Sequence, residues 1–185
     1  MALLVAGCAS LPPARDAGDW PARRASLQGL EHWSLTGRIA VATATEGFSG
    51  GLSWRQDGMH ADIEIRGALG RSLAVKVDGE GLSVSDSRGA ALQGEAASEL
   101  VASEFGTPLP VGELRYWLVG APAPGVPHQE SVGIDGRLAY LEQQGWRVRY
   151  LRYQSEGGFE LPARIEIETA GVRLRLAVAD WMLAP

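Results

Sequence analysis

The sequence has only one cysteine and no long apolar run, and both features limit the kinds of protein that it can be. Cys8 is the only cysteine among 185 residues, so an internal disulfide is excluded. No apolar run reaches the roughly 18 residues that a membrane-spanning helix needs, which predicts that no helix crosses a bilayer. The formal net charge is −5, and without a basic excess we expect no nucleic-acid partner.

Motifs for catalysis and for cofactor binding are also missing. The three histidines, His32, His60 and His128, are not spaced as metal ligands. The chain has no GxSxG elbow, no HExxH helix and no glycine-rich phosphate loop. Carboxylates such as Glu64 and Glu166 fall on the polar side of alternating segments, as expected for a solvated strand face. We therefore predict no enzyme, no metal site and no cofactor.

The residues before Cys8 suggest why the chain has one cysteine. The segment LVAGC, residues 4–8, resembles the end of a bacterial lipoprotein signal, in which small residues admit a peptidase and the thiol is acylated. Seven residues are too few for a whole signal, so we expect residues 1–7 to be part of one. Residues 8–18 contain two prolines and are predicted to form a lipidated tether, followed by one domain over 19–185. The alternative is a buried amino-terminal cysteine.

Hydrophobic periodicity predicts a mainly β domain. Period-two alternation indicates strands over segments 33–41, 52–54, 60–66, 72–77, 82–84, 138–140, 146–150, 164–168 and 172–178. Helical spacing predicts three short helices, over 20–31, 95–105 and 111–120, and the proline- and glycine-rich stretch 121–133 is expected to be an exposed loop. About ten or eleven strands, nearly all antiparallel, favour an open (incomplete) antiparallel β-barrel with the helices covering one mouth.

The connection between two of these strands is unusually apolar. Gly67-Ala68-Leu69-Gly70 joins the alternating segments 60–66 and 72–77, where a hairpin tip is normally polar. Two interpretations remain open. Leu69 either folds back onto a neighbouring loop or is an exposed apolar tip that touches a membrane.

Several segments, taken in order, resemble the LolB family. They are WSLTGRIAV at 33–41, GGLSWRQ at 50–56, GALG at 67–70, LPVGELRYWLVG at 109–120 and GWRVRY at 145–150. The resemblance implies an open β-barrel covered by helices, with an apolar cavity for acyl chains. It also implies a monomer anchored in the outer membrane and facing the periplasm. Such a protein accepts client lipoproteins from a LolA-type periplasmic carrier and inserts them into outer-membrane lipid, and in this family a leucine at the position of Leu69 serves membrane insertion.

Strand parity then supplies candidates for the acyl-chain cavity. They share the apolar face of their segments: Trp33, Leu35, Ile39, Leu52, Trp54, Ile63, Ile65, Leu73, Val75, Trp146, Val148, Leu174 and Leu176. For each of them, packing in a solid core is an equal alternative to lining a cavity. Two other functions also remain open, a soluble periplasmic carrier of the LolA type and a structural lipoprotein that transports nothing.

The lipid anchor leads to a first prediction. Cys8→Ala should yield a soluble periplasmic protein that still accepts lipoproteins, because a proline-containing tether separates the anchor from the domain. Cell fractionation followed by a salt wash measures this, since acyl chains hold a protein on a membrane through burial of methylenes and not through charge. Retention of the variant in the washed outer-membrane fraction would mean that Cys8 is not the anchor.

Overall fold

The computed structural model describes residues 19–68, 72–87, 89 and 91–184, so Cys8, the tether and Leu69 lie outside the described residues. The strands are β1 (His32–Ala42), β2 (Gly47–Asp57), β3 (His60–Gly67), β4 (Ser72–Asp78), β5 (Gly81–Asp86), β6 (Ala91–Gln93), β7 (His128–Val132), β8 (Leu138–Gln143), β9 (Trp146–Glu156), β10 (Phe159–Thr169) and β11 (Val172–Leu183). The helices are α1 (Trp20–Gln28), α2 (Gly94–Phe105) and α3 (Val111–Val119).

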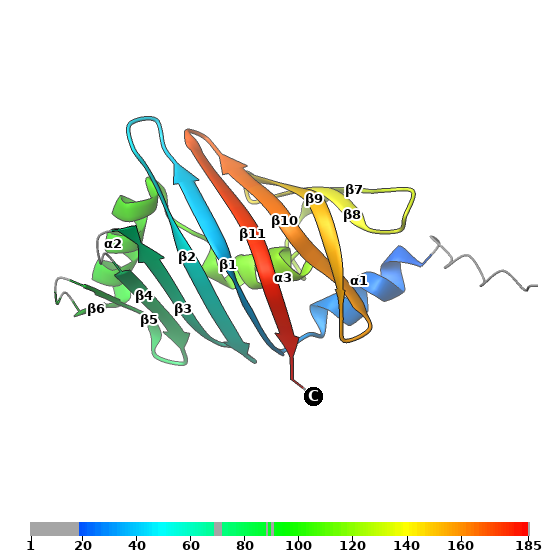
Figure 1. The fold of residues 1–185 in the computed structure, drawn as a ribbon, viewed down its shortest axis with the longest axis horizontal. Coiled ribbons are helices and arrows are strands. Elements are labelled where there is room, and N and C mark those ends of the chain that lie inside the picture. The colour runs from blue at the N-terminus through cyan, green and yellow to red at the C-terminus, as the bar shows by residue number, and fades with distance from the viewer. Residues whose placement is uncertain (1–18, 69–71, 88, 90, 185) are drawn as a thin grey trace, which may run out of the picture.

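All the described strands belong to one antiparallel sheet with the order β6-β5-β4-β3-β2-β1-β11-β10-β9-β8-β7. β6 and β7 are its two edges and do not pair with each other, so the curled sheet stays open. In the view of Figure 1, α2 and α3 lie behind the sheet, against its inner face. The predicted open barrel of about ten or eleven strands with three helices is therefore confirmed.

The alternation in sequence becomes a buried and an exposed face. In the β3–β4 hairpin Ile63 lies opposite Val75, and both are buried. Asp62 lies opposite Lys76 on the solvent face, where their side chains approach within 3.8 Å. Because the side-chain period of a strand is two, this register places every second residue of both strands in the interior.

A bulge bends the central pair of strands. Thr36 pairs with Asp180 and Gly37 with Val178, which leaves Ala179 as an extra residue in β11. A Cβ atom on Gly37 would lie 2.3 Å from the carbonyl oxygen of Ala177, so only glycine fits where the two backbones approach. Bulges increase local twist, and this one lies in the middle of the sheet, where it helps the sheet to curl.

The helices begin and end as their sequences predict, with small differences. Asp19 caps α1 by accepting a hydrogen bond from the Ala22 amide at 3.1 Å, and the helix ends at Gln28, a few residues before the predicted end. Gly106 and Gly120 terminate α2 and α3 in the left-handed conformation.

The stretch 121–133 is not the exposed loop that its prolines and glycines predict. Ala121 and Ala123 are buried, and residues His128–Val132 form the edge strand β7. The reason is Gln143 of β8, which is 1% exposed and donates hydrogen bonds to the carbonyl oxygens of Ala123 at 3.0 Å and Val126 at 3.1 Å. A buried amide thus replaces the water that a loop backbone would otherwise need.

Gln143 also holds α3, because its Oε1 accepts from Trp117 Nε1 at 2.7 Å and from the Ala123 amide at 2.9 Å. Gln143→Leu would leave these two donors and two carbonyl oxygens unpaired in the core, each at a cost of roughly 1–3 kcal/mol. We expect the free energy of unfolding, measured in urea, to fall by about 3 kcal/mol or more. Gln129→Leu on exposed β7 is the matched control and should change it by at most about 0.5 kcal/mol. Equal losses in both variants would show that the buried amide has no special role.

Candidate functional site

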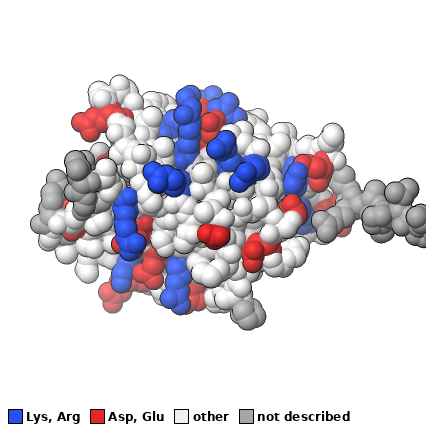
Figure 2. All heavy atoms as spheres, in the orientation of Figure 1, with Lys and Arg blue, Asp and Glu red and all other residues white. Residues whose placement is uncertain are grey.

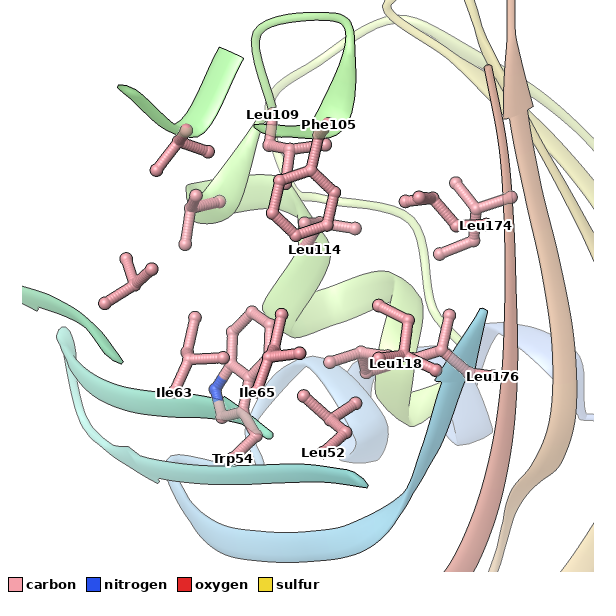
Figure 3. A pocket seen from close by; sticks show the side chains of 15 residues that line it. Leu52, Trp54, Ile63, Ile65, Phe105, Leu109, Leu114, Leu118, Leu174 and Leu176 are labelled. Atoms are coloured by element: carbon pink, nitrogen blue, oxygen red, sulfur yellow. The ribbon is translucent and has the colours of Figure 1, made fainter. Parts of the chain in front are cut away.

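An entirely apolar cavity lies between the inner face of the sheet and the helices α2 and α3 (Figure 3). Its walls are aliphatic and aromatic side chains from β1–β4, β10 and β11 on one side and from α2, α3 and their connection on the other. The lining residues are Ile39, Leu52, Trp54, Ile63, Ile65, Val75, Val101, Phe105, Leu109, Val111, Leu114, Leu118, Ile167, Leu174 and Leu176. No ionisable side chain is among them, so the cavity favours an apolar ligand.

Two periodicities bring these side chains together. On the strands, residues two apart, such as Ile63 and Ile65, project into the same space. On the helices, residues four apart do so. These are Val101 and Phe105 on α2, and Leu114 and Leu118 on α3. In Figure 3 the labelled side chains of the strands and of the helices point toward a common interior.

The one polar atom on the wall is satisfied within the wall. Trp54 donates its indole N–H to Gln56 Oε1 at 2.9 Å, and Gln56 donates in turn to the carbonyl oxygens of Gly58 and His60 at 2.9 and 3.0 Å. Gln56 is 4% exposed, and these bonds complete its amide. The face that Trp54 turns toward the cavity is therefore free of any unmet hydrogen-bonding group.

Buried hydrogen bonds fix α3 at its carboxyl end. The hydroxyl of Tyr150 on β9 donates to the Trp117 carbonyl oxygen at 2.9 Å, in addition to the Gln143 contact described above. Burial raises the pKa of Tyr150 well above its ordinary value, so the hydroxyl keeps its proton and remains a donor. The Tyr150 bond thus attaches α3, which forms part of the cavity wall, to the sheet.

The cavity is small as it stands. Its free volume is about 50 Å³, whereas pockets for small organic ligands are roughly 300–1,000 Å³. A wider pocket of about 420 Å³, which we call the mouth pocket, adjoins the cavity at the ends of β2, β3 and β4. Ile65 lines both spaces. Phe48 of this mouth pocket meets Phe105 of the cavity edge-on, with ring centroids 5.7 Å apart. A long chain therefore needs these side chains to separate before it can occupy the interior.

Eight of the thirteen residues proposed from parity line the cavity: Ile39, Leu52, Trp54, Ile63, Ile65, Val75, Leu174 and Leu176. Leu73 does not, because it is only half-buried and lines the mouth pocket instead. Trp33, Leu35, Trp146 and Val148 are buried but are absent from the cavity wall.

All four are buried, and two of them, Trp33 and Trp146, pack against other aromatic rings. The ring of Trp33 meets Trp181 at 5.3 Å and Trp54 at 6.0 Å between centroids, and Trp146 meets Trp117 at 6.3 Å. Parity identifies the inward face of a strand, but the side chains from elsewhere decide whether that part of the face is filled. In this structure the four residues therefore pack in the core, the alternative that the sequence left open for each of them.

Seven lining residues were missed by reasoning from strands alone: Val101, Phe105, Leu109, Val111, Leu114, Leu118 and Ile167. Most come from the helices and their connection. The apolar stripes of 95–105 and 111–120 were visible in the sequence, but a stripe is the same whether a helix covers a cavity or a closed core. Ile167 belongs to an alternating segment and would have followed from parity.

Among residues 19–68, 72–87, 89 and 91–184, no three histidine, cysteine or carboxylate side chains gather as metal ligands. Over the same ranges, no helix is long and apolar enough to cross a membrane.

The fold and the cavity together define a class, the open antiparallel β-barrel with an apolar interior covered by helices. A LolA superfamily protein from Nitrosomonas europaea has this fold, with a TM-score of 0.53 and 16% identity over 89% of this chain and 93% of that one. The family described as "Outer membrane lipoprotein LolB" matches residues 31–181, and this chain belongs to it.

Curated relatives agree over almost the whole length. The outer-membrane lipoprotein LolB of Nitrosococcus oceani is 36% identical, over 98% of this chain and 93% of that protein. Its counterpart in Stutzerimonas stutzeri is 34% identical, over 98% and 91%. The family resemblance of the ordered motifs is thereby confirmed.

The cavity wall generates a prediction at Ile65. Ile65→Glu should weaken the binding of a fluorescent fatty acid by at least about tenfold, or 1.4 kcal/mol, because it sets a carboxylate beside the apolar chain. The fold should survive, since the new side chain can turn toward the wider mouth pocket and its water.

Ile65→Leu is the matched control, because it keeps the apolar volume and should bind the probe nearly as the parent does. Circular dichroism checks that both variants are folded. Unchanged binding by a folded glutamate variant would contradict a ligand in this cavity.

Proposed function

We propose that this protein is an outer-membrane lipoprotein that faces the periplasm, accepts other lipoproteins from a LolA-type carrier and inserts them into the outer membrane. The observation that carries the proposal is the all-apolar cavity under α2 and α3 in a chain of the LolB family. Residues 1–7 belong to the signal, Cys8 carries the lipid, and residues 8–18 tether the domain. The acyl chains of the client occupy the cavity, and the protein acts as a monomer.

The cavity accounts for a transfer without bond chemistry. Acyl chains that leave the carrier must stay out of water, since each exposed methylene costs about 0.8 kcal/mol. A wall without charged or unmet polar groups offers them the same environment as the carrier or the bilayer. We assign no catalytic residue, because no covalent bond of the client has to change.

The direction of transfer follows from affinity. The sequence has no nucleotide-binding motif, so each step has to run downhill, and each tenfold gain in affinity needs about 1.4 kcal/mol. The cavity is small, and widening it for a long chain separates apolar contacts such as that between Phe48 and Phe105. Once the chains reach the bilayer, the cavity closes again, and these restored contacts favour release.

The two alternative functions are distinguished by acyl-chain displacement. A structural lipoprotein would not exchange a fluorescent fatty acid for the acyl chains of a client lipoprotein, whereas a transporter would. A soluble carrier would exchange the chains but would lack a lipid on Cys8, which mass spectrometry of the mature protein detects.

The proposed release step generates a prediction at Leu69, which lies outside the described residues. Burial of one leucine contributes only about 1.5–3 kcal/mol, too little to hold the protein on a membrane but enough to orient an anchored molecule. Leu69→Glu should leave acceptance from the carrier intact and impair release, so that client lipoprotein accumulates on this protein. Transfer from the loaded protein to liposomes measures this.

Leu69→Phe is the control, because it retains an apolar side chain and should keep most of the transfer activity. Melting curves of both variants test the alternative interpretation of this residue. Normal transfer by the glutamate variant, or a melting temperature lowered by many degrees, would place Leu69 in a packed loop.

A further inference from the structure

The outer face of the sheet, opposite α2 and α3, carries a concentration of arginine that the proposed transport does not use. We call it the basic face; it consists of Arg38, Arg147, Arg149, Arg152, Arg164, Arg173 and Arg175, on β1, β9, β10 and β11. Figure 2 looks onto this side of the molecule, and blue spheres gather there over the upper part of the sheet. The whole chain has a net charge of −5, so the positive charge is a local feature.

Part of this charge is neutralised by two glutamates. Glu166 lies 3.1 Å from both Arg149 and Arg175, and Glu168 lies 2.7 Å from both Arg149 and Arg173. Burial by itself would raise the pKa of Glu168, but its hydrogen bonds to Arg173 and Arg149 and their charges lower it, so the carboxylate stays ionised. Glu142 of β8 also lies opposite Arg147, but the seven arginines outnumber the carboxylates beside them, so the basic face keeps a net positive charge.

The remaining charge has no partner in the described protein. Arg38, Arg152 and Arg164 are exposed and form no ion pair or hydrogen bond with the described residues. Arg152 and Arg164 are moreover direct neighbours in the register of β9 and β10. Like charges opposite each other on adjacent strands are destabilising. The fold gains nothing from this pair, whereas an anion above it would remove the repulsion.

The spacing of the arginines leaves room for such anions. Arg164 lies opposite Ala177, and Ala177 lies opposite Arg38, whose other neighbour is Gly51. The small residues Ala177 and Gly51 separate arginine side chains by two strand spacings, roughly 10 Å. The exposed arginine side chains on either side can reach a phosphate group over the small residue, and the planar guanidinium fork matches two phosphate oxygens at once.

We infer that the basic face is a binding surface for the phosphate groups of anionic phospholipids. A lipid surface fits it better than an acidic protein for two reasons. Leu151 is 53% exposed and lies between Arg149 and Arg152 on β9, and an apolar side chain among basic ones is typical of a membrane interface. The second reason is the position of the β3–β4 connection. Ser72, the residue that follows it, lies in the same row across the sheet as Arg38, with Gly51 and Arg66 between them.

This surface would orient the domain on the bilayer independently of its cargo. The basic face and the β3–β4 connection lie toward the same end of the sheet, at which the mouth pocket also opens. Binding of lipid phosphates there turns the mouth of the cavity toward the membrane. The interaction adds to the lipid anchor, and it requires neither a client lipoprotein nor an occupied cavity.

Vesicle co-sedimentation of the full chain tests the inference. The chain carries Cys8→Ala, so that an anchor does not mask the interaction. We expect it to bind vesicles of phosphatidylcholine and phosphatidylglycerol in equal parts, not vesicles of phosphatidylcholine alone, and to dissociate as salt is added. Neutralising two unpaired arginines, Arg38→Gln with Arg164→Gln, should weaken binding about thirtyfold, since each basic residue near such a surface contributes about 1 kcal/mol, a factor of about five.

Arg55→Gln is the matched control. Arg55, on β2, is exposed on the same outer side of the sheet, but it lies outside the basic face and opposite Asp62. Its loss should therefore weaken vesicle binding by about twofold or less. Binding of a fluorescent fatty acid should be unchanged in all these variants, which separates this result from a failure of the cavity proposal.

Four results would overturn the inference. The parent could bind neither kind of vesicle, or both equally. The double variant could sediment with anionic vesicles as well as the parent does. Finally, the double variant could lose binding to a purified LolA-type carrier while it keeps vesicle binding, and the partner of the basic face would then be a protein.

Discussion

The pairing of β1 with β11 is the contact on which the rest of the structure depends. It joins two meanders, β1–β6 and β7–β11, from opposite ends of the chain, with a register that runs from Trp33 opposite Leu183 to Ala42 opposite Arg173. The cavity takes its walls from both meanders, for example Leu52 from the first and Leu174 from the second. Without this pairing each meander would expose an apolar face, and neither could enclose a space.

The interior combines a solid part and a yielding part. Around Trp33 and Trp146, aromatic rings fill the space, and around Gln143 buried hydrogen bonds fix α3 and the following segment to the sheet. The cavity between them has only aliphatic and aromatic walls, whose dispersion contacts are individually weak and without strict direction. Such a wall can separate around an acyl chain and close after it leaves, whereas a network of buried hydrogen bonds would resist both movements.

The two faces of the sheet carry different kinds of interaction. The inner face excludes water and holds no ionised side chain at the cavity, while the outer face concentrates arginines across four neighbouring strands. A two-residue repeat makes this division possible, because adjacent residues such as Arg38 and Ile39 point to opposite sides. The mouth pocket lies at the end of β3 and the start of β4, and the basic face lies toward this same end of the sheet.

The sequence by itself determined the kind of fold and the side of each strand that is buried. Alternation in segments such as 60–66 has one physical cause, a pleated strand with one wet face, and the helices at 95–105 and 111–120 followed equally from their period. The order of the motifs was sufficient to indicate the LolB family. Proline and glycine misled the prediction for 121–133, because β7 (HQESV) has no apolar alternation and its neighbour Gln143 is distant in sequence.

Only the tertiary structure decided which buried residues surround a space. Ile63 lines the cavity and Trp33 does not, although both obey the same parity, because the difference lies in what reaches them from α2, α3 and β11. The row that joins Arg164 to Arg38 was equally hidden, since it depends on the register between three strands and on a bulge. Periodicity is a local property of the chain, whereas a cavity or a charged row is made by residues that only folding brings together.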